Sequence, residues 1–403
     1  MSITLGIDRL LNESALRARL KGKRVALLAH PASVTKDLEH SLDALMRVGG
    51  VNVTAAFGPQ HGMRGEKQDN MIESSDYQDP QHRIPVFSLY GEVRRPTPAM
   101  LSTFDVILID LQDVGCRIYT FLTTLFYILE DCAAAGGKEI WVLDRPNPAG
   151  RPIEGNKLNM DFKSFVGAAP VPMRHGLTLG EAALWYKAFA KLNIEVEVVK
   201  MKDYSPDKPG ELGWPAADLA WVNPSPNMPR LSTARQYAGT VLIEGTKLSE
   251  ARGTTRPLEM FGAANMDMNL VLSTMQTNYA PWLKGCALRA AFYEPTFHKF
   301  KGQLVSALQI HVDGPFYNHQ AFKPYRIVCA FLKTVHAHYP DFDMWLSPPY
   351  EYEKEKMPID ILSGNSYLRE WVGNPKASAQ DFENFLSKDE KAWEVERKPF
   401  LLY

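Results

Sequence analysis

The chain has few cysteines and no spacing that would tie them into a metal or disulfide motif. Its 403 residues contain four scattered cysteines, with no Cys-x-x-Cys pair and no His-x-x-x-His pattern. This arrangement argues against a structural zinc site and against a disulfide framework in a chain of this size. We therefore expect function to rest on other side chains, with no metal.

Long apolar runs are also missing. No apolar stretch reaches about 18 residues, and the first 20 residues lack the uninterrupted apolar core of a signal peptide. We expect no membrane partner and a cytoplasmic location for the chain as printed. A leader removed beforehand would instead place the protein in the periplasm or outside the cell.

An excess of charge of one sign is absent. The 45 basic and 46 acidic residues give a net charge of -1, without the broad positive surface that nucleic acids require. Glycine-rich phosphate-binding loops are absent as well. The first apolar strand leads into Ala-His-Pro-Ala-Ser-Val at 29–34, with no Gly-x-Gly-x-x-Gly and no Walker sequence nearby. We expect neither a nucleic-acid partner nor a cofactor.

Short apolar runs alternate with helical patterns through most of the chain. This alternation predicts an α/β fold with a parallel sheet covered by helices on both faces. The expected strands are 23–30, 51–57, 84–89, 104–111, 140–143, 194–200 and 240–244, and the expected helices are 37–48, 119–135 and 179–192. After residue 255 the pattern changes to that of a smaller α+β domain, so we predict domains 1–255 and 256–403 with the active cleft between them.

Polar loops follow several of the predicted strands. Their sequences are FGPQHGMRG, LIDLQDVGCRIYTF, LDRPNPAGR and IEGTKLSEARGTTRP. Ligands of open α/β sheets bind outside the carboxyl ends of the strands. Four such loops, rich in Asp, Arg, Asn and Glu, predict a shared polar cleft.

Seven motifs in fixed order carry a family resemblance. They are P-x-H-G-x-R-G, S-L-Y-G before a basic pair and P-T-P, D-x-Q-D-V-G-x-R-x-Y-T, L-D-R-P-N-P-x-G, R-H-G-x-T-x-G-E, P-S-P-N-M-P and E-G-T-x-L-S-E-x-R-G-T-T-R-P. The chain resembles the NamZ family of exo-β-N-acetylmuramidases, formerly a domain of unknown function. The resemblance implies a Rossmann-like domain joined to a smaller domain. It also implies release of N-acetylmuramic acid (MurNAc) from the non-reducing end of peptidoglycan fragments, with a muropeptide or another MurNAc-containing saccharide as substrate.

Five arginines in the motif loops are candidates for binding the lactyl carboxylate of such a substrate. They are Arg64, Arg117, Arg174, Arg252 and Arg256. A planar guanidinium binds a carboxylate through two parallel hydrogen bonds. We expect Arg64, Arg117 and Arg252 to meet in one groove. The alternative is that each arginine pairs with nearby acidic residues and holds a loop together.

Gln60 departs from the family pattern. The corresponding block commonly reads Pro-Glu-His-Gly, with that Glu a favoured catalytic residue, and an amide is not a proton donor of the carboxylic-acid kind. Glycosidases usually need two carboxyl groups, so we predict Glu73 as the substitute acid and Glu244 as the second acidic group, with Asp113 as a further candidate. Alternatively the acetamido group of the substrate assists, Gln60 orients it, or the protein binds muramyl ligands without cleaving them.

The remaining candidates could contact a sugar or serve the fold. His61 and His175 are predicted as proton-transfer or hydrogen-bonding groups, with a purely structural role as the alternative. Tyr90 and Tyr119 could stack on a sugar or pack internally. Asn147 and Asn227 lie beside prolines that stiffen the backbone, which suits binding of sugar hydroxyls but also a plain turn. A homodimer is left open.

Overall fold

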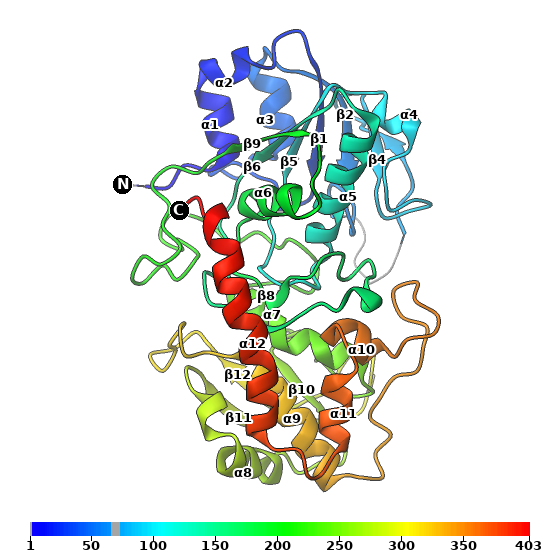
Figure 1. Ribbon diagram of the computed structural model, residues 1–403, viewed down its shortest axis with the longest axis vertical. Helices are drawn as coiled ribbons and strands as arrows, with labels where there is room; N and C mark the ends of the chain where they lie inside the picture. Colours follow the sequence, from blue (N-terminus) through cyan, green and yellow to red (C-terminus); the bar gives the residue numbers. More distant parts are fainter. Residues whose placement is uncertain (1, 66–72) are drawn as a thin grey trace.

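The computed structural model describes residues 2–65 and 73–403 and has two lobes (Figure 1). The upper lobe is built on a seven-stranded sheet with the order β3-β4-β2-β1-β5-β6-β9, in which only β3 runs antiparallel to its neighbour. In chain order its strands are β1 (Arg24–Ala29), β2 (Asn52–Gly58), β3 (Tyr77–Gln78), β4 (Pro85–Ser88), β5 (Val106–Asp110), β6 (Glu139–Leu143) and β9 (Glu195–Val199).

Helices cover both faces of this sheet, and the alternation of side chains along the strands explains why. On β1, Leu27 packs on one face with α1 (Gly6–Asn12) and α3 (Ser41–Val48), while Leu28 packs on the other with α5 (Thr120–Ala135) and α6 (Leu179–Phe189). Both strand faces are apolar because each meets a helix layer. The predicted Rossmann-like α/β fold is confirmed.

The lower lobe contains a three-stranded antiparallel sheet, with the order β10-β12-β11, and most of the later helices. Its elements are α7 (Leu231–Thr240), β10 (Met260–Ala263), α8 (Met268–Asn278), β11 (Ala287–Tyr293), β12 (Val305–His311), α9 (Pro324–His338), α10 (Pro358–Ser363) and α11 (Tyr367–Gly373). This agrees with the expected smaller α+β part. The exact division at residue 255 stays a prediction.

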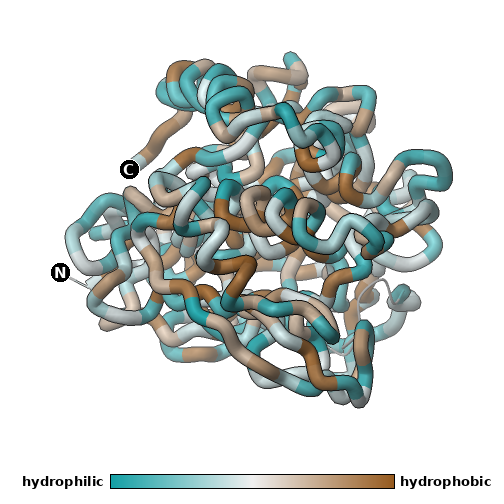
Figure 2. The backbone as a smooth tube through the Cα atoms, turned by 90° about the horizontal axis from the view of Figure 1, so that it is seen from below, coloured by the Kyte–Doolittle hydropathy of each residue, from teal (hydrophilic) through white to brown (hydrophobic). Residues whose placement is uncertain are grey.

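Small elements complete the chain. They are α2 (Ser14–Ala18), α4 (Pro98–Leu101), β7 (Glu154–Lys157), β8 (Pro172–Arg174) and the 3-10 helices η1 (Met160–Phe162), η2 (Val241–Gly245), η3 (Ala280–Leu283) and η4 (Lys398–Phe400). Hydrophobic segments gather inside the molecule and hydrophilic ones lie outside, as Figure 2 shows. Among the described residues, no helix combines the length and apolar character needed to cross a bilayer.

Two predicted elements differ from the structure. The segment 240–244 was expected to close the parallel sheet, but it ends α7 and forms η2 instead. Its apolar side chains are buried among helices, where Gly245 lies against the backbone of Ile359, so a short buried apolar run was mistaken for a strand. The helix expected from residue 37 begins at Ser41, because Leu38 adopts a positive φ of 67° in a turn.

The last long helix, α12 (Ala379–Arg397), crosses both lobes (Figure 1). Arg326 of α9, whose side chain is fully buried, donates to both carboxylate oxygens of Glu383 and Glu390 at 2.7–2.9 Å. Its guanidinium also lies 3.5 Å from the carboxylate of Glu154 on β7. One arginine therefore joins α9, α12 and the β7–β8 hairpin.

Replacing Arg326 with leucine should lower the free energy of unfolding by about 3–5 kcal/mol, because three carboxylates then lose their shared counter-charge. Urea unfolding followed by circular dichroism measures this. Arg47→Leu is the control: its ion pair with Glu39 is largely exposed, so its loss should cost less than about 1 kcal/mol. Equal effects of the two substitutions would contradict the assignment.

Candidate active site

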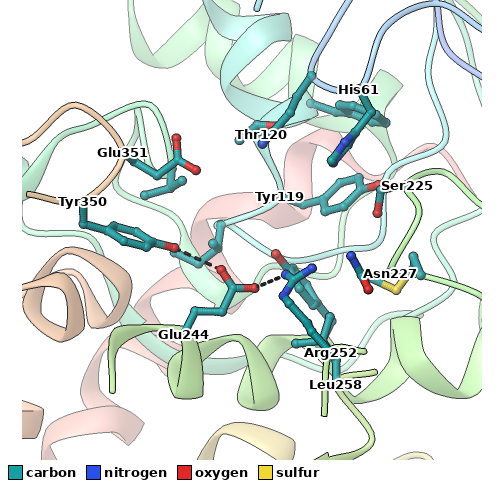
Figure 3. Close-up of a pocket in the computed structure, with 16 residues that line it drawn as sticks. His61, Tyr119, Thr120, Ser225, Asn227, Glu244, Arg252, Leu258, Tyr350 and Glu351 are labelled. Atoms are coloured by element: carbon teal, nitrogen blue, oxygen red, sulfur yellow. Dashed lines mark hydrogen bonds and ion pairs between the residues drawn. The ribbon is translucent and has the colours of Figure 1, made fainter. Parts of the chain in front are cut away.

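A pocket with about 530 Å³ of empty space lies between the two lobes (Figure 3). Its lining comes from both lobes and consists of Gln60, His61, Ile118, Tyr119, Thr120, Phe121, Val166, Ser225, Asn227, Met228, Tyr237, Glu244, Arg252, Leu258, Tyr350 and Glu351. Three of the four polar loops predicted to share a cleft contribute to the pocket, through Gln60 and His61, through 118–121, and through Glu244 and Arg252.

The loops that follow β2 and β5, on either side of β1, supply the upper wall at the carboxyl edge of the sheet. Gln60 and His61 follow β2 directly, in a tight turn closed by the N–H of Gly62 donating to the carbonyl of Pro59. His61 has a φ of 73°. Tyr119 and Thr120 begin α5, after the loop that leaves β5. This placement follows the rule for open parallel sheets.

The lower wall is polar and charged. Arg252 donates to the carboxylate of Glu244 at 2.6 Å, and the hydroxyl of Tyr350 donates to the same carboxylate at 3.1 Å. The Arg252 guanidinium also lies 3.3 Å from Glu250. Burial alone would lower the pKa of Arg252, but the Glu244 and Glu250 carboxylates raise it above its usual value. Arg252 is a permanent cation in the pocket wall.

Glu351 is the second carboxyl group of the pocket. Glu351 is only 6% exposed, and the Tyr90 hydroxyl donates to its carboxyl group at 3.3 Å. Burial and the negative charge of Glu244 raise the pKa of Glu351 to about 7, although the Tyr90 hydrogen bond acts in the opposite direction. A carboxyl group with this pKa is partly protonated near neutral pH and suits general acid catalysis.

Gln60 faces this pair from the upper wall. Its side-chain carbonyl accepts a hydrogen bond of 2.8 Å from the Thr120 hydroxyl, which leaves the amide NH₂ as the donor end. Gln60 is buried in the pocket wall. It can orient a substrate group through hydrogen bonds, but it has no acidic proton to donate.

Six of the predicted site residues line the pocket: Gln60, His61, Tyr119, Asn227, Glu244 and Arg252. Of the five arginines, only Arg252 does. Arg64 pairs with Asp43 at 2.8 Å and lies near Asp79. The prediction that Arg64, Arg117 and Arg252 meet in one groove is therefore wrong, because only Arg252 lines the pocket.

The other three arginines are held by the protein itself. Arg117 is buried and donates to the carbonyl oxygens of Asn156, Val171, Leu362 and Ser363. Arg174 donates to the carbonyls of Ala149 and Phe322, and Arg256 pairs with Glu259 at 3.0 Å. Each of these guanidinium groups therefore holds loops together, as in the alternative prediction for the motif arginines.

The remaining predicted residues lie outside the pocket lining. Glu73, favoured as the acid, pairs with Arg94 at 2.9 Å, and this hydrogen bond lowers its pKa, whereas an acid needs a raised one. Asp113 accepts from the Gly115 N–H and lies 3.5 Å from His175. Asp113 and His175 are both buried, outside the pocket lining.

Asn147 and Tyr90 also serve neighbouring groups. The Asn147 amide donates to the Leu177 carbonyl and its oxygen accepts from the Ala149 N–H, so it shapes a buried turn. Tyr90 is fully buried and reaches the pocket only through its hydrogen bond to Glu351. Neither side chain is placed to contact a ligand directly.

The most important residue missed by the sequence reasoning is Glu351. It belongs to the Pro-Pro-Tyr-Glu-Tyr-Glu segment at 348–353, in which aromatic and acidic residues alternate far from every motif loop. That composition was the available signal. Ser225 and Tyr237 also line the pocket without having been predicted. Ser225 lies in the P-S-P-N-M-P motif, two residues before the predicted Asn227, whereas nothing in the local sequence of Tyr237 sets it apart. In the described part of the chain, no three His, Cys, Asp or Glu side chains are grouped to hold a metal ion.

Two family models match consecutive parts of the chain. The model described as exo-beta-N-acetylmuramidase NamZ, N-terminal, matches residues 25–232, and the corresponding C-terminal model matches residues 235–403. The chain belongs to the NamZ family. The predicted family is thereby confirmed over almost the whole sequence.

Known NamZ relatives agree with this assignment. The peptidoglycan beta-N-acetylmuramidase NamZ of Bacillus subtilis (strain 168) is 36% identical over 402 residues, covering 100% of this chain and 91% of the relative. Two crystal structures of DUF1343 family proteins from Bacteroides fragilis are 29% and 26% identical, with TM-scores of 0.84 and 0.72. Each match covers 100% of this chain and 99% of the Bacteroides fragilis chain.

The raised pKa of Glu351 should make stability depend on pH. Its pKa rises on folding from 4.5 to about 7, so the folded protein binds the proton more tightly. The resulting stabilisation is complete below about pH 4.5 and is lost as the pH rises through about 7. At about 1.36 kcal/mol per pKa unit, the free energy of unfolding of wild type relative to Glu351→Gln should fall by about 3 kcal/mol between pH 4.5 and 8.

Urea unfolding of both proteins at the two pH values measures this difference. Glu355→Gln, which alters an exposed carboxylate of the same segment, is the control and should show no such pH dependence relative to wild type. A constant difference between wild type and Glu351→Gln would rule out a raised pKa at this position.

Proposed function

We propose that this chain is an exo-β-N-acetylmuramidase that releases MurNAc from the non-reducing end of peptidoglycan fragments. The observation that carries the proposal is that one pocket of this NamZ-family chain contains two carboxyl groups with different partners. Glu244 is paired with the Arg252 guanidinium, whereas Glu351 is buried beside the Tyr90 hydroxyl. Glycoside cleavage needs one carboxyl group that keeps its proton and a second that remains negative. The proposed substrate is a MurNAc-containing saccharide, and a homodimer remains a prediction.

Glu351 is the proposed general acid. Burial and the neighbouring Glu244 charge keep it partly protonated near neutral pH, so it can donate a proton to the glycosidic oxygen as the bond breaks. Tyr90, which donates to its carboxyl group, is a positioning residue. Glu351 thereby takes the role that Gln60 is unable to fill.

Glu244 is the proposed negative partner. Arg252 and Tyr350 both donate to its carboxylate, which fixes the direction of the carboxylate. Positive charge develops on the sugar ring in the transition state, and a carboxylate held in place stabilises that charge without having to reorganise.

Arg252 is the proposed ligand of the lactyl carboxylate. Its guanidinium carries five N–H donors, more than its contacts with Glu244 and Glu250 use. A charge-assisted hydrogen bond contributes about 1.5–3 kcal/mol. That is enough to select MurNAc over a hexosamine without the lactyl group.

Gln60 is proposed to orient the 2-acetamido group. Thr120 occupies the carbonyl end of its amide, so the NH₂ end is available to a substrate oxygen. This arrangement fits substrate assistance, in which the acetamido group itself attacks the anomeric carbon. Asn227, His61 and Tyr119 complete the wall around the sugar.

A chromogenic MurNAc glycoside tests the activity. Wild type should release the chromophore, and absence of release across pH 4–9 would exclude the proposed function. With the MurNAc–GlcNAc disaccharide, whose leaving group is poor, Glu351→Gln should lower kcat by about 10²–10⁴ because general acid catalysis is lost. The pH–rate profile should also lose its decline near pH 7.

Glu355→Gln is the matched control for this experiment, since it makes the same chemical change at an exposed position of the same segment. It should leave both the rate and the pH profile as in wild type. An unaltered pH profile in Glu351→Gln would show that another group donates the proton.

A second candidate function is muramyl binding without cleavage, and Gln60 is the observation that favours it. If Glu351 supplies the proton, Gln60→Glu should change kcat by less than about tenfold, well below the effect of losing an acid. Steady-state kinetics of both proteins, with calorimetric titration of MurNAc, make the comparison. Tight binding without turnover in wild type, together with a gain of about 100-fold or more in Gln60→Glu, would establish the binding role instead.

A further inference from the structure

A second recess shares the lining residue Glu351 with the pocket. We call it the outer groove. It has about 1,150 Å³ of empty space, and Glu351 belongs to the linings of both recesses. The side chains of the outer groove that matter here are Glu73, Arg94, Lys163, Glu351, Tyr352 and Glu353.

We propose that the outer groove binds the leaving-group sugar, a neutral pyranose on the reducing side of the bond that is cut. The inference rests on the proposed function. If Glu351 protonates the glycosidic oxygen, that oxygen lies at its carboxyl group, between the two recesses. MurNAc then occupies the pocket, and the sugar that leaves extends into the outer groove.

The backbone at this junction has an uncommon conformation. Glu351 and Tyr352 are consecutive and both have positive φ angles, 44° and 71°. Such angles are disfavoured for side-chain-bearing residues and persist where the surrounding structure imposes them, often at functional sites. Here they allow Glu351 to be buried at the pocket while Tyr352 stands 54% exposed in the outer groove.

Tyr352 is held in place although it is exposed. Its ring lies 4.3 Å from the guanidinium carbon of Arg94, whose other neighbour is the ring of Tyr90 at 4.4 Å. The Tyr352 hydroxyl donates to Glu73, which also accepts from Arg94 at 2.9 Å. A fixed aromatic face of this kind can cover the apolar C–H face of a pyranose at little cost in side-chain entropy.

The charges of the outer groove indicate a neutral occupant. Four carboxylic side chains line it, including Glu92, against two cations, Arg94 and Lys163, and Glu73 already neutralises Arg94. Carboxylates accept hydrogen bonds from sugar hydroxyls, but they repel an acidic sugar. N-Acetylglucosamine (GlcNAc), which has hydroxyl groups and no charge, fits this surface.

Two substrates with different leaving groups test the proposal. The β-fluoride of MurNAc has a one-atom leaving group that does not reach the outer groove, whereas MurNAc–GlcNAc fills it. In Tyr352→Ala, the ratio of kcat/KM for the disaccharide to kcat/KM for the fluoride should fall at least tenfold. In Tyr352→Phe, which keeps the ring, the ratio should fall less than threefold. Lys163→Ala is a second groove variant, and Lys388→Ala on the exposed side of α12 is its control.

The outcomes separate this inference from the proposed function. An unchanged ratio in Tyr352→Ala and Lys163→Ala, with fluoride still released, overturns the groove assignment and leaves the enzyme activity standing. If wild type processes neither substrate, the proposed function fails, and saturation-transfer NMR with GlcNAc decides the groove separately. A GlcNAc signal that disappears in Tyr352→Ala supports the site, and a signal of equal strength in both proteins overturns it.

Discussion

Two carboxyl groups buried in one pocket repel each other when both are charged. In this pocket the two groups have different hydrogen-bonding partners. Glu244 receives a guanidinium and a phenol hydroxyl as partners. Glu351 accepts a hydrogen bond from the neutral Tyr90 hydroxyl, and burial together with the Glu244 charge raises its pKa to about 7. The burial and the neighbouring Glu244 charge that make Glu351 hard to ionise also make it useful as an acid. The chemistry we propose depends on this asymmetry.

The two lobes position their pocket residues in different ways. The upper lobe brings residues at the ends of parallel strands, such as Gln60 after β2, whose last four residues are buried and held by the sheet. The lower lobe brings η2 and the loop around Glu351, held by side-chain contacts across the pocket and by two residues with positive φ. Arg326 and α12 tie the lobes together at a distance from the pocket. The position of Gln60 relative to the two carboxyl groups therefore depends on how the lobes pack.

The arginines show how a motif can serve the fold that carries a site. Arg117 donates to four backbone carbonyls from three separate segments. Burying a backbone carbonyl without a hydrogen-bond donor would destabilise the fold. Arg174 and Arg256 are likewise occupied by neighbouring groups. Only Arg252 lines the pocket. Arginines that organise loops and an arginine that faces a ligand look alike in a sequence, because both occur in polar loops.

The sequence by itself determined the fold class, the family and six of the pocket residues. Alternating apolar runs specify a parallel sheet, whose carboxyl edge brings loops such as that of Gln60 together. Only the tertiary structure decided that Glu351 lies opposite Glu244, while Glu73 turns away to Arg94. The physical reason is that burial and neighbouring charge set the pKa of a carboxyl group, and both arise only when segments more than 100 residues apart pack against each other.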